Sequence, residues 1–373
     1  MQNRLLGLML LIILTSSLIA CSGSMPVKVQ SIELRFTEND WPEKVRVDES
    51  RADLEKIQRE WQDWQARPNS PANQEVPSYR LEVKLSGQEQ VYYLTHDLGL
   101  FNDELNMEYL PPSNTRQMLQ AAVERLKQQR FGQLVSWQEA DRLLPRYSTF
   151  QLMDLDTGIT WNVQRRAGSS HADIQPLTEQ DTQKLKAVYG GTWSWDRRAV
   201  VVLMDDRRIA GSINGMPHGA GALRNGFPGH HCLHFWQSTT HTKRKPDAAH
   251  QVMVHKAAGC LLPYLAGLEP ADLQMAMLEM AGQGETAILR LGIRNPVSGS
   301  DPSQLANRIS NIKVWDSLPV EEGADCVVIS YKVSVYYVGD TKEHRKAITV
   351  TSRYHEQWER WLVEPDFLDQ LIR

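Results

Sequence analysis

The sequence predicts an α+β protein of several domains, with a β-rich central domain between two smaller α+β modules. Segments whose apolar residues recur at helical spacing alternate along the chain with segments in which every second residue is apolar. The chain has 373 residues, which is more than one ordinary domain holds. We expect a leader over residues 1–20, followed by domains over residues 21–130, 131–268 and 269–373.

The leader has the layout of a signal peptide. Arg4 precedes an apolar run from Leu5 to Leu14, which is shorter than the roughly 20 residues that a membrane-spanning helix needs. The segment Leu18-Ile19-Ala20-Cys21 resembles the lipobox of bacterial lipoproteins. The resemblance implies that Cys21 becomes the lipidated first residue of an extracytoplasmic protein held to the cell membrane. A secretory signal peptide cleaved at another position is the alternative.

Charge and cysteine content narrow the possible partners. The formal net charge is -4 and both signs are interspersed, so the sequence predicts no basic face for nucleic acid. Besides Cys21 the chain has Cys232, Cys260 and Cys326, an odd number for an oxidising compartment. At least one of them is therefore expected to be a free thiol or to pair between chains.

The first module is predicted to be a small α+β unit. Apolar residues at helical spacing predict a helix from Asp53 to Gln65, and a segment rich in Pro, Asn and Ser predicts a loop from Arg67 to Pro77. Two alternating runs, 79–85 and 90–95, predict a hairpin, and a second helix is expected to end near Arg130. We interpret the unit as an accessory module, because no chemical constellation occurs in it.

The central domain is predicted to consist mainly of hairpins. Ser136 and Thr178 each begin a helix, since an acidic residue follows each of them three positions later. Alternating runs separated by turn residues predict two hairpins, over residues 150–155 with 159–165 and over residues 199–204 with 208–213.

Helices and a long hairpin are predicted toward the C-terminus. Pro246 is expected in the first turn of one helix, and a Met- and Leu-rich helix begins near Pro270. Alternating residues over 327–337 and 347–352 predict two long strands joined by a turn at Gly339. This curved-sheet pattern resembles the NTF2-like fold.

The segment 214–241 holds the residues most suited to chemistry. It is rich in Gly, Pro and His, and a loop of this length in a compact domain is usually functional or disordered. Its aromatic and apolar residues argue against disorder. Around one thiol it gathers four imidazoles, from His218, His230, His231 and His234 next to Cys232. A cysteine is a useful nucleophile only as a thiolate, and a nearby imidazole can hold the proton. The alternative for Cys232 is a small buried hydrophobic residue.

Two short pieces of this loop carry a family resemblance. His218-Gly219, followed by Gly229-His230-His231-Cys232-Leu233-His234, resembles the signature of YkuD-type L,D-transpeptidases. In that family His-Gly precedes a Ser-His-Gly-Cys-hydrophobic-Arg segment. The wider block over residues 150–250 also resembles a group of Bacillus-type secreted proteins with the same signature.

The resemblance implies a cysteine enzyme without a cofactor that forms an acyl-enzyme on peptidoglycan stem peptides. It implies that Cys232 is the nucleophile, that His218 is the general base and that His230 is the histidine two positions before the nucleophile. The backbone N–H groups of His231 and Cys232 would then help to form an oxyanion hole.

Two of the departures from the family pattern change the chemistry of the site. His231 replaces a glycine and His234 replaces an arginine, so a fixed cation for a substrate carboxylate is lost. We assign His231, His234, Gly219, His171 and Asp173 to the oxyanion and substrate part of the site. A surface loop is the alternative for His171 and Asp173.

Two other classes of function stay open. His171, Asp173 and the cluster from His230 to His234 offer ligands for a zinc-dependent peptidoglycan peptidase. The spacing of His230 and His234 would need a helix to converge on a metal, whereas the Gly and Pro residues upstream favour a turn. The third class is a wall-binding lipoprotein without catalysis.

Overall fold

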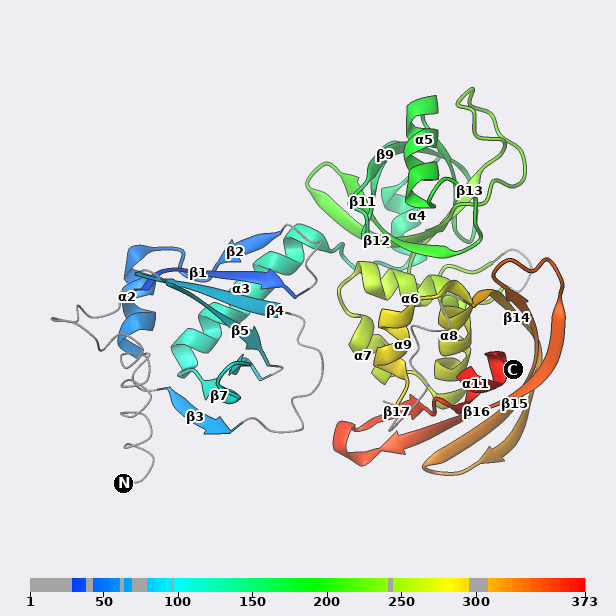
Figure 1. Cartoon of the computed structure of the whole chain (residues 1–373). Helices are drawn as coiled ribbons and strands as arrows, with labels where there is room; N and C mark the ends of the chain where they lie inside the picture. The colour runs from blue at the N-terminus through cyan, green and yellow to red at the C-terminus, as the bar shows by residue number, and fades with distance from the viewer. Residues whose placement is uncertain are drawn as a thin grey trace. The chain divides into compact units, whose positions relative to one another are not determined.

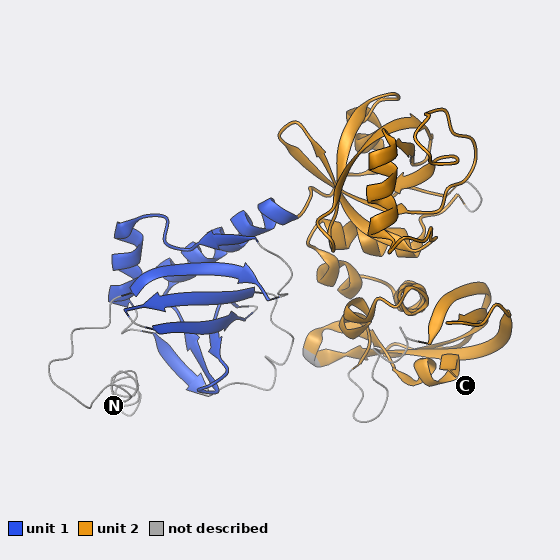
Figure 2. Cartoon of the chain, turned by 45° about the horizontal axis from the view of Figure 1, so that its top comes forward, with its two compact units in different colours: residues 1–130 blue, residues 131–373 orange. Residues whose placement is uncertain are grey.

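The computed structural model describes residues 29–37, 43–60, 64–68, 79–86, 88–95, 97–240, 244–294 and 308–372. The predicted leader and Cys21 lie outside these residues. No helix within the described ranges is long and apolar enough to cross a membrane. The chain divides into two compact units, residues 1–130 and 131–373 (Figure 2).

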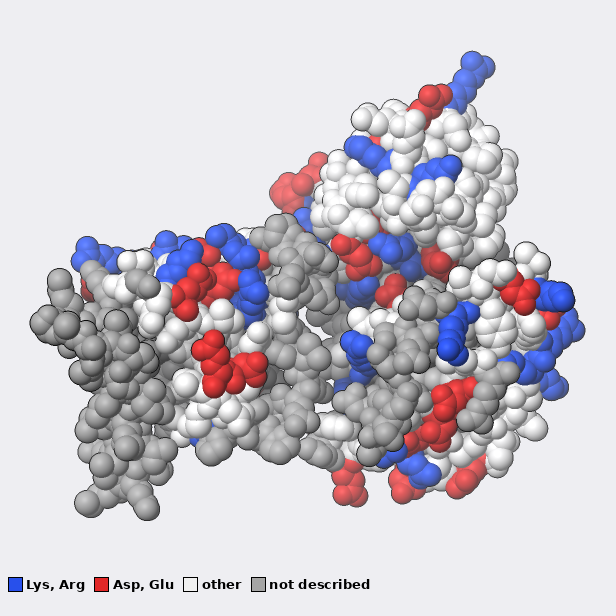
Figure 3. Space-filling model, in the orientation of Figure 1, with Lys and Arg blue, Asp and Glu red and all other residues white. Residues whose placement is uncertain are grey.

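The α+β class and the organisation into more than one compact unit are confirmed. The expected boundary between residues 268 and 269 lies inside the second unit. On the face that Figure 3 shows, acidic side chains lie close to basic ones in both units.

In its described residues, the first unit is a seven-stranded sheet with the helices α2 and α3. Its strand order is β2-β1-β4-β5-β6-β7-β3. The elements are β1 (Val29–Phe36), β2 (Lys44–Arg46), α2 (Arg51–Glu60), β3 (Gln65–Pro68), β4 (Tyr79–Leu85), β5 (Gln88–Leu94), β6 (Leu100–Asn102), β7 (Met107–Leu110) and α3 (Ser113–Arg130). The predicted hairpin of β4 and β5 and the predicted helix α3 are confirmed.

One prediction in this unit is wrong. The helix expected from Asp53 to Gln65 ends at Glu60, and Gln65–Pro68, partly expected as a loop, forms strand β3. Strand β3 pairs with β7, with Gln65 opposite Leu110. The paired residues of the two strands lie about 40 positions apart in sequence, and such tertiary pairing overrides local helix spacing.

The second unit opens with a closed six-stranded barrel in the order β10-β13-β12-β11-β8-β9. Its elements are α4 (Trp137–Leu143), β8 (Thr149–Asp154), β9 (Thr160–Ala167), β10 (Ala172–Pro176), α5 (Glu179–Val188), β11 (Arg197–Met204), β12 (Arg207–Asn214) and β13 (His231–His234). Both predicted hairpins and the N-caps at Ser136 and Thr178 are confirmed.

Strand alternation gives the barrel two different faces. Val200 and Val202 of β11 point into the barrel core, whereas Ala199 and Val201 pack on the outside against the helices that follow. This outer core continues into the C-terminal sheet.

Within the described residues, five α-helices, one 3-10 helix and a four-stranded sheet complete the unit (Figure 1). The elements are α6 (Ala248–Ala257), α7 (Leu261–Ala266), α8 (Pro270–Gln283), α9 (Thr286–Gly292), β14 (Ile309–Glu322), β15 (Cys326–Tyr337), β16 (His344–His355), η3 (Glu356–Trp358), β17 (Arg360–Val363) and α11 (Asp366–Ile372). The long hairpin of β15 and β16 is confirmed. Pro246 lies outside the helix, because Asp247 is the N-cap of α6 and Pro246 pairs with Thr239 instead.

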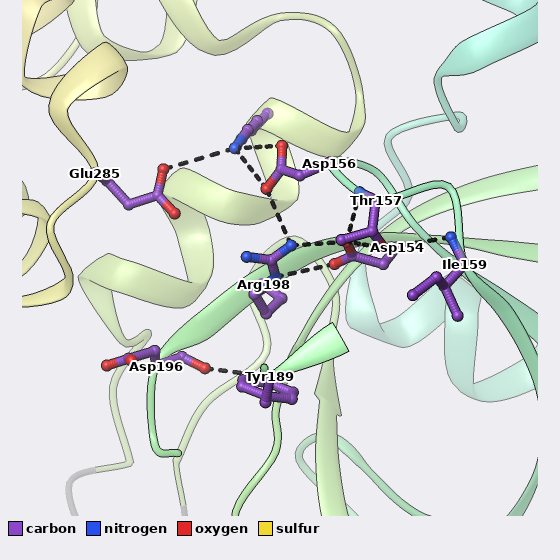
Figure 4. Close-up of polar contacts among 9 residues, drawn as sticks. Asp154, Asp156, Thr157, Ile159, Tyr189, Asp196, Arg198 and Glu285 are labelled. Carbon is purple, nitrogen blue, oxygen red and sulfur yellow. Dashed lines mark hydrogen bonds and ion pairs between the residues drawn. The ribbon is translucent and has the colours of Figure 1, made fainter. Parts of the chain in front are cut away.

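A network of charges, buried at Asp154 and partly buried elsewhere, joins the barrel to the helices (Figure 4). Arg198 of β11 donates to both carboxylate oxygens of Asp154, at 3.0 and 2.7 Å, and lies 3.5 Å from Asp156. Lys256 of α6 lies 2.8 Å from Asp156 and 3.6 Å from Glu285, the N-cap of α9. Buried charges need such partners, so the network fixes α6 against the barrel wall.

Candidate active site

Strand β13 presents the cysteine on the outer face of the barrel. Asp173 of β10 lies opposite Cys232 in register. Because side chains alternate along a strand, Cys232 and His234 share one face, and His231 and Leu233 share the other. Leu233 belongs to the barrel core, so the face of Cys232 is the outer one. Asp173 shares this face, and His171 approaches the thiol from the same side.

The loop before β13 holds His218 against this face. The backbone N–H of His218 donates to the carbonyl of His230, and the N–H of His230 donates back, both at 2.9 Å. Gly229 has φ 132°, and a Cβ there would lie 2.5 Å from the carbonyl oxygen of His218. Only glycine therefore permits this close approach.

Cys232 and His218 form a hydrogen-bonded pair. The Sγ atom of Cys232 lies 3.3 Å from Nε2 of His218. The Nδ1 atom of His218 lies 2.9 Å from the carbonyl oxygen of Met216, which can only accept. Nδ1 therefore carries a proton, and Nε2 is the nitrogen that exchanges a proton with the thiol.

A second imidazole, that of His171, approaches the thiol from the residue just before β10. Its Nδ1 lies 2.9 Å from the carbonyl oxygen of Thr239, and its Nε2 lies 3.4 Å from Asp173 Oδ1. Asp173 Oδ1 also lies 3.8 Å from Nε2 of His230. The thiol therefore lies between two imidazoles, and the carboxylate of Asp173 contacts two of the neighbouring rings.

The electrostatics favour a thiolate. Burial raises the pKa of the Cys232 thiol, but hydrogen bonds from His171 and His218 outweigh burial, and the pKa lies below its ordinary value. Burial lowers the pKa of His171, but bonding to Asp173 and Cys232 outweighs it and raises this pKa to about 10. The hydrogen bond to Cys232 raises the pKa of His218. These directions agree with a thiolate stabilised by imidazolium.

The side chain of His231 points away from the thiol. The ring is fully buried, its Nδ1 lies 2.9 Å from the carbonyl oxygen of Asn214, and it contacts Phe227 edge to face. Burial lowers the pKa of His231 to about 3, so the ring is neutral. A histidine at position 231, where the L,D-transpeptidase signature has glycine, is thus accommodated in the barrel within a regular strand.

His234 lies in a stack of three imidazoles. Its ring centre lies 4.3 Å from that of His171 and 3.8 Å from that of His250 on α6, with interplanar angles of 14° and 8°. Ser212 hydrogen-bonds Nδ1 of His250 at 2.9 Å. Burial holds the pKa of His234 well below its ordinary value, so this ring supplies no fixed cation in place of the family's arginine.

Sequence reasoning missed several residues that support the site. Gln175 donates to the carbonyl of Gly229 at 2.6 Å and accepts from Ala222 N–H at 3.0 Å, which fixes the loop that carries His218. Trp195 lies 5.3 Å from the ring of His218 and is half exposed. Two features of the sequence could have indicated these residues. Gln175 is a polar residue in a strand that is fully buried, and Trp195 lies in the Trp193-Ser-Trp195 segment. His250 is a buried packing residue at one end of the stack of three imidazoles.

The other described cysteines lie elsewhere in the second unit. Cys260 is the N-cap residue of α7, and Cys326 is the buried first residue of β15. Cys232 is a free thiol.

Replacing Cys260 and Cys326 together by serine is expected to leave the activity of the protein within about twofold of wild type. Neither thiol belongs to the cluster at Cys232, and the proposed chemistry uses one thiol. A folded double variant that has lost turnover, with folding followed by circular dichroism, would show that one of these thiols takes part.

Comparison with protein-family models and with curated proteins finds no relative. The chain matches no protein-family model, and no curated protein matches it at a significant level. The chemistry of the site therefore has to be inferred from its own residues and from the short motif around them.

Proposed function

We propose that the protein is an L,D-transpeptidase-like enzyme that forms an acyl-enzyme on Cys232 and acts on peptidoglycan stem peptides. The observation that carries the proposal is the 3.3 Å contact between Cys232 Sγ and His218 Nε2, with the other nitrogen of that ring bonded to a backbone carbonyl. This contact joins the two residues that match the nucleophile and the base of the family signature.

The reaction follows from this pair. The Cys232 thiolate attacks a peptide carbonyl of the stem peptide, and a tetrahedral oxyanion forms. His218, which carries the former thiol proton on Nε2, donates it to the leaving amine as the C–N bond breaks. An incoming amine or water then loses a proton to His218 and attacks the thioester, which restores the thiol. An amine acceptor gives a cross-link, and water gives a trimmed peptide.

His171 and Asp173 act behind the thiol in this scheme. Both side chains are buried, so an imidazolium at His171 stabilises the thiolate by its charge while His218 moves the proton. The backbone N–H groups of His231 and Cys232 and the backbone at Gly219 remain our candidates for the oxyanion and substrate contacts. His230 has a side chain that is 21% exposed, and we place it toward the entry of substrate.

The barrel would be the catalytic domain, and the remaining parts would serve it. We propose that the first unit is an accessory module for spacing or wall binding. The C-terminal sheet with its helices would be an NTF2-like module, although it shares a hydrophobic core with the outer wall of the barrel.

Turnover of tetrapeptide muropeptides, followed by liquid chromatography and mass spectrometry, tests the function. We expect cross-linked or shortened products that form equally well in the presence of a chelator. A chelator that stops the reaction, together with activity that survives Cys232→Ala, would favour the zinc peptidase built on His171, Asp173 and the cluster from His230 to His234. Binding of muropeptides without any product would favour the non-catalytic wall-binding protein.

Lipid attachment gives a separate prediction. Replacing Cys21 by alanine is expected to release most of the protein from the membrane fraction, because a diacylglyceryl group at this thiol supplies the apolar contact with the bilayer. Fractionation and immunoblotting measure the effect, with wild type as the control. A Cys21→Ala protein that still sediments with membranes at its leader-free size would show that the lipid is not the anchor.

A further inference from the structure

We propose that His171, Cys232 and His234 form a binding site for a divalent zinc-like ion, which takes the thiolate as a ligand and reversibly blocks the nucleophile. The blocking role depends on the proposed function. Binding of the ion does not depend on it.

The three side chains are grouped as a metal site requires. One ligand atom from each, the thiol sulfur and one ring nitrogen of each imidazole, lies within 4.8 Å of the other two, and all three residues are buried. In a tetrahedral zinc site, Zn–S and Zn–N bonds of about 2.3 and 2.0 Å place ligand atoms roughly 3.3 to 3.6 Å apart. Side-chain movements of about 1 Å would therefore close the site around an ion.

The hydrogen bonds of His171 suit metal ligation. Nδ1 lies against the Thr239 carbonyl and so carries a proton, which leaves Nε2 as the nitrogen nearest the thiol side. Metal-bound histidines commonly donate their other ring N–H to a carbonyl in this way. Asp173, beside Nε2, would balance part of the charge of the ion.

The environment of the His234 ring is a second, independent observation that supports a metal site. Its ring is 2% exposed, and its Nδ1 atom is buried without a hydrogen-bond partner in the described part of the chain. A buried polar nitrogen without a partner is unfavourable, and a metal bond would satisfy it. The stack between His171 and His250 already holds the ring in place, so little conformational entropy is lost on binding.

Binding would compete with the catalytic pair. The ion takes the sulfur lone pairs that otherwise contact His218, and the proton shared within the thiol–imidazole cluster leaves to solvent. Three protein ligands leave one position for water, as in open zinc sites. The His218 ring is not among the ligands, so it is dispensable for binding of the ion.

The test is zinc binding by the reduced full-length protein, measured by competition with a chromogenic chelator. We expect one ion per chain, protection of Cys232 from iodoacetamide, and at least a roughly 100-fold loss of affinity in His234→Phe, since even changes outside the ligands cost 10- to 100-fold. The matched control is His250→Phe, the same change one ring further along the stack, which should keep the affinity within about threefold.

Two further measurements keep the test decisive. Co²⁺ bound to wild type should give a cobalt–thiolate charge-transfer band that Cys232→Ser abolishes, which serves even if His234→Phe fails to fold. His218→Ala should still bind one zinc ion per chain, so loss of acyl transfer and loss of metal binding are separable. Equal zinc affinity in wild type and folded His234→Phe, absence of the cobalt band, or no stoichiometric zinc binding would each overturn the proposal.

Discussion

Cys232→Ala is expected to reduce turnover of muropeptides to the background rate while the protein stays folded. The sulfur is the atom that forms the thioester, and no other described thiol lies in the cluster at His218 and His171. The substitution removes one buried atom, so we expect a loss of only about 1 kcal/mol in the free energy of unfolding. Turnover by mass spectrometry and stability by urea unfolding measure the two effects.

The matched control for this variant is Cys326→Ala. Cys326 is also a buried cysteine of the second unit, and it lies in β15 rather than in the barrel. It should lose a similar amount of stability and retain turnover. Turnover in Cys232→Ala close to that of the control would contradict a covalent mechanism at Cys232.

His218→Ala is expected to slow alkylation of Cys232 by iodoacetamide at pH 7 by roughly tenfold or more, since one pKa unit changes the thiolate fraction about tenfold. In wild type the hydrogen bonds of His218 and His171 lower the thiol pKa, so the thiolate persists below the ordinary thiol pKa. Without His218 the pKa rises and labelling shifts to higher pH. Near pH 10, where Cys232 is expected to be ionised in wild type and in His218→Ala alike, the labelling rates of the two proteins should converge.

The control for the pH profile is His344→Ala. His344 lies in β16 and pairs with Asp340, away from the barrel. Its profile should coincide with that of wild type. If His218→Ala has the same profile as His344→Ala, the imidazole of His218 does not activate the thiol.

Local patterns in the sequence predicted the hairpins and the helix starts of the second unit. Alternation over 199–204 and 208–213 is visible within the single short segment 199–213, and a side-chain cap such as Thr178 needs only the next turn. The pairing of Cys232 with His218 was also predictable, because the two residues lie only 14 positions apart in one short segment.

The grouping of the histidines could not be predicted in the same way. His171 reaches the thiol because β10 pairs with β13 about 60 residues later, and no local signal gives that register. The sequence analysis required a helix to bring His234 into a cluster of ligands, but His234 lies in strand β13 and still joins His171 and Cys232. Period-two alternation then turns Cys232 and His234 outward and His231 into the barrel.

The most direct test of the account is the intact mass of the protein after rapid quenching of a reaction with tetrapeptide muropeptides. We expect an added mass equal to the acyl part of the stem peptide, and peptide mapping should place it on Cys232. The adduct should be absent from Cys232→Ala and should disappear on incubation with hydroxylamine, as a thioester does. Product formation without any adduct on Cys232 in wild type, or an adduct mapped to another residue, would contradict the account.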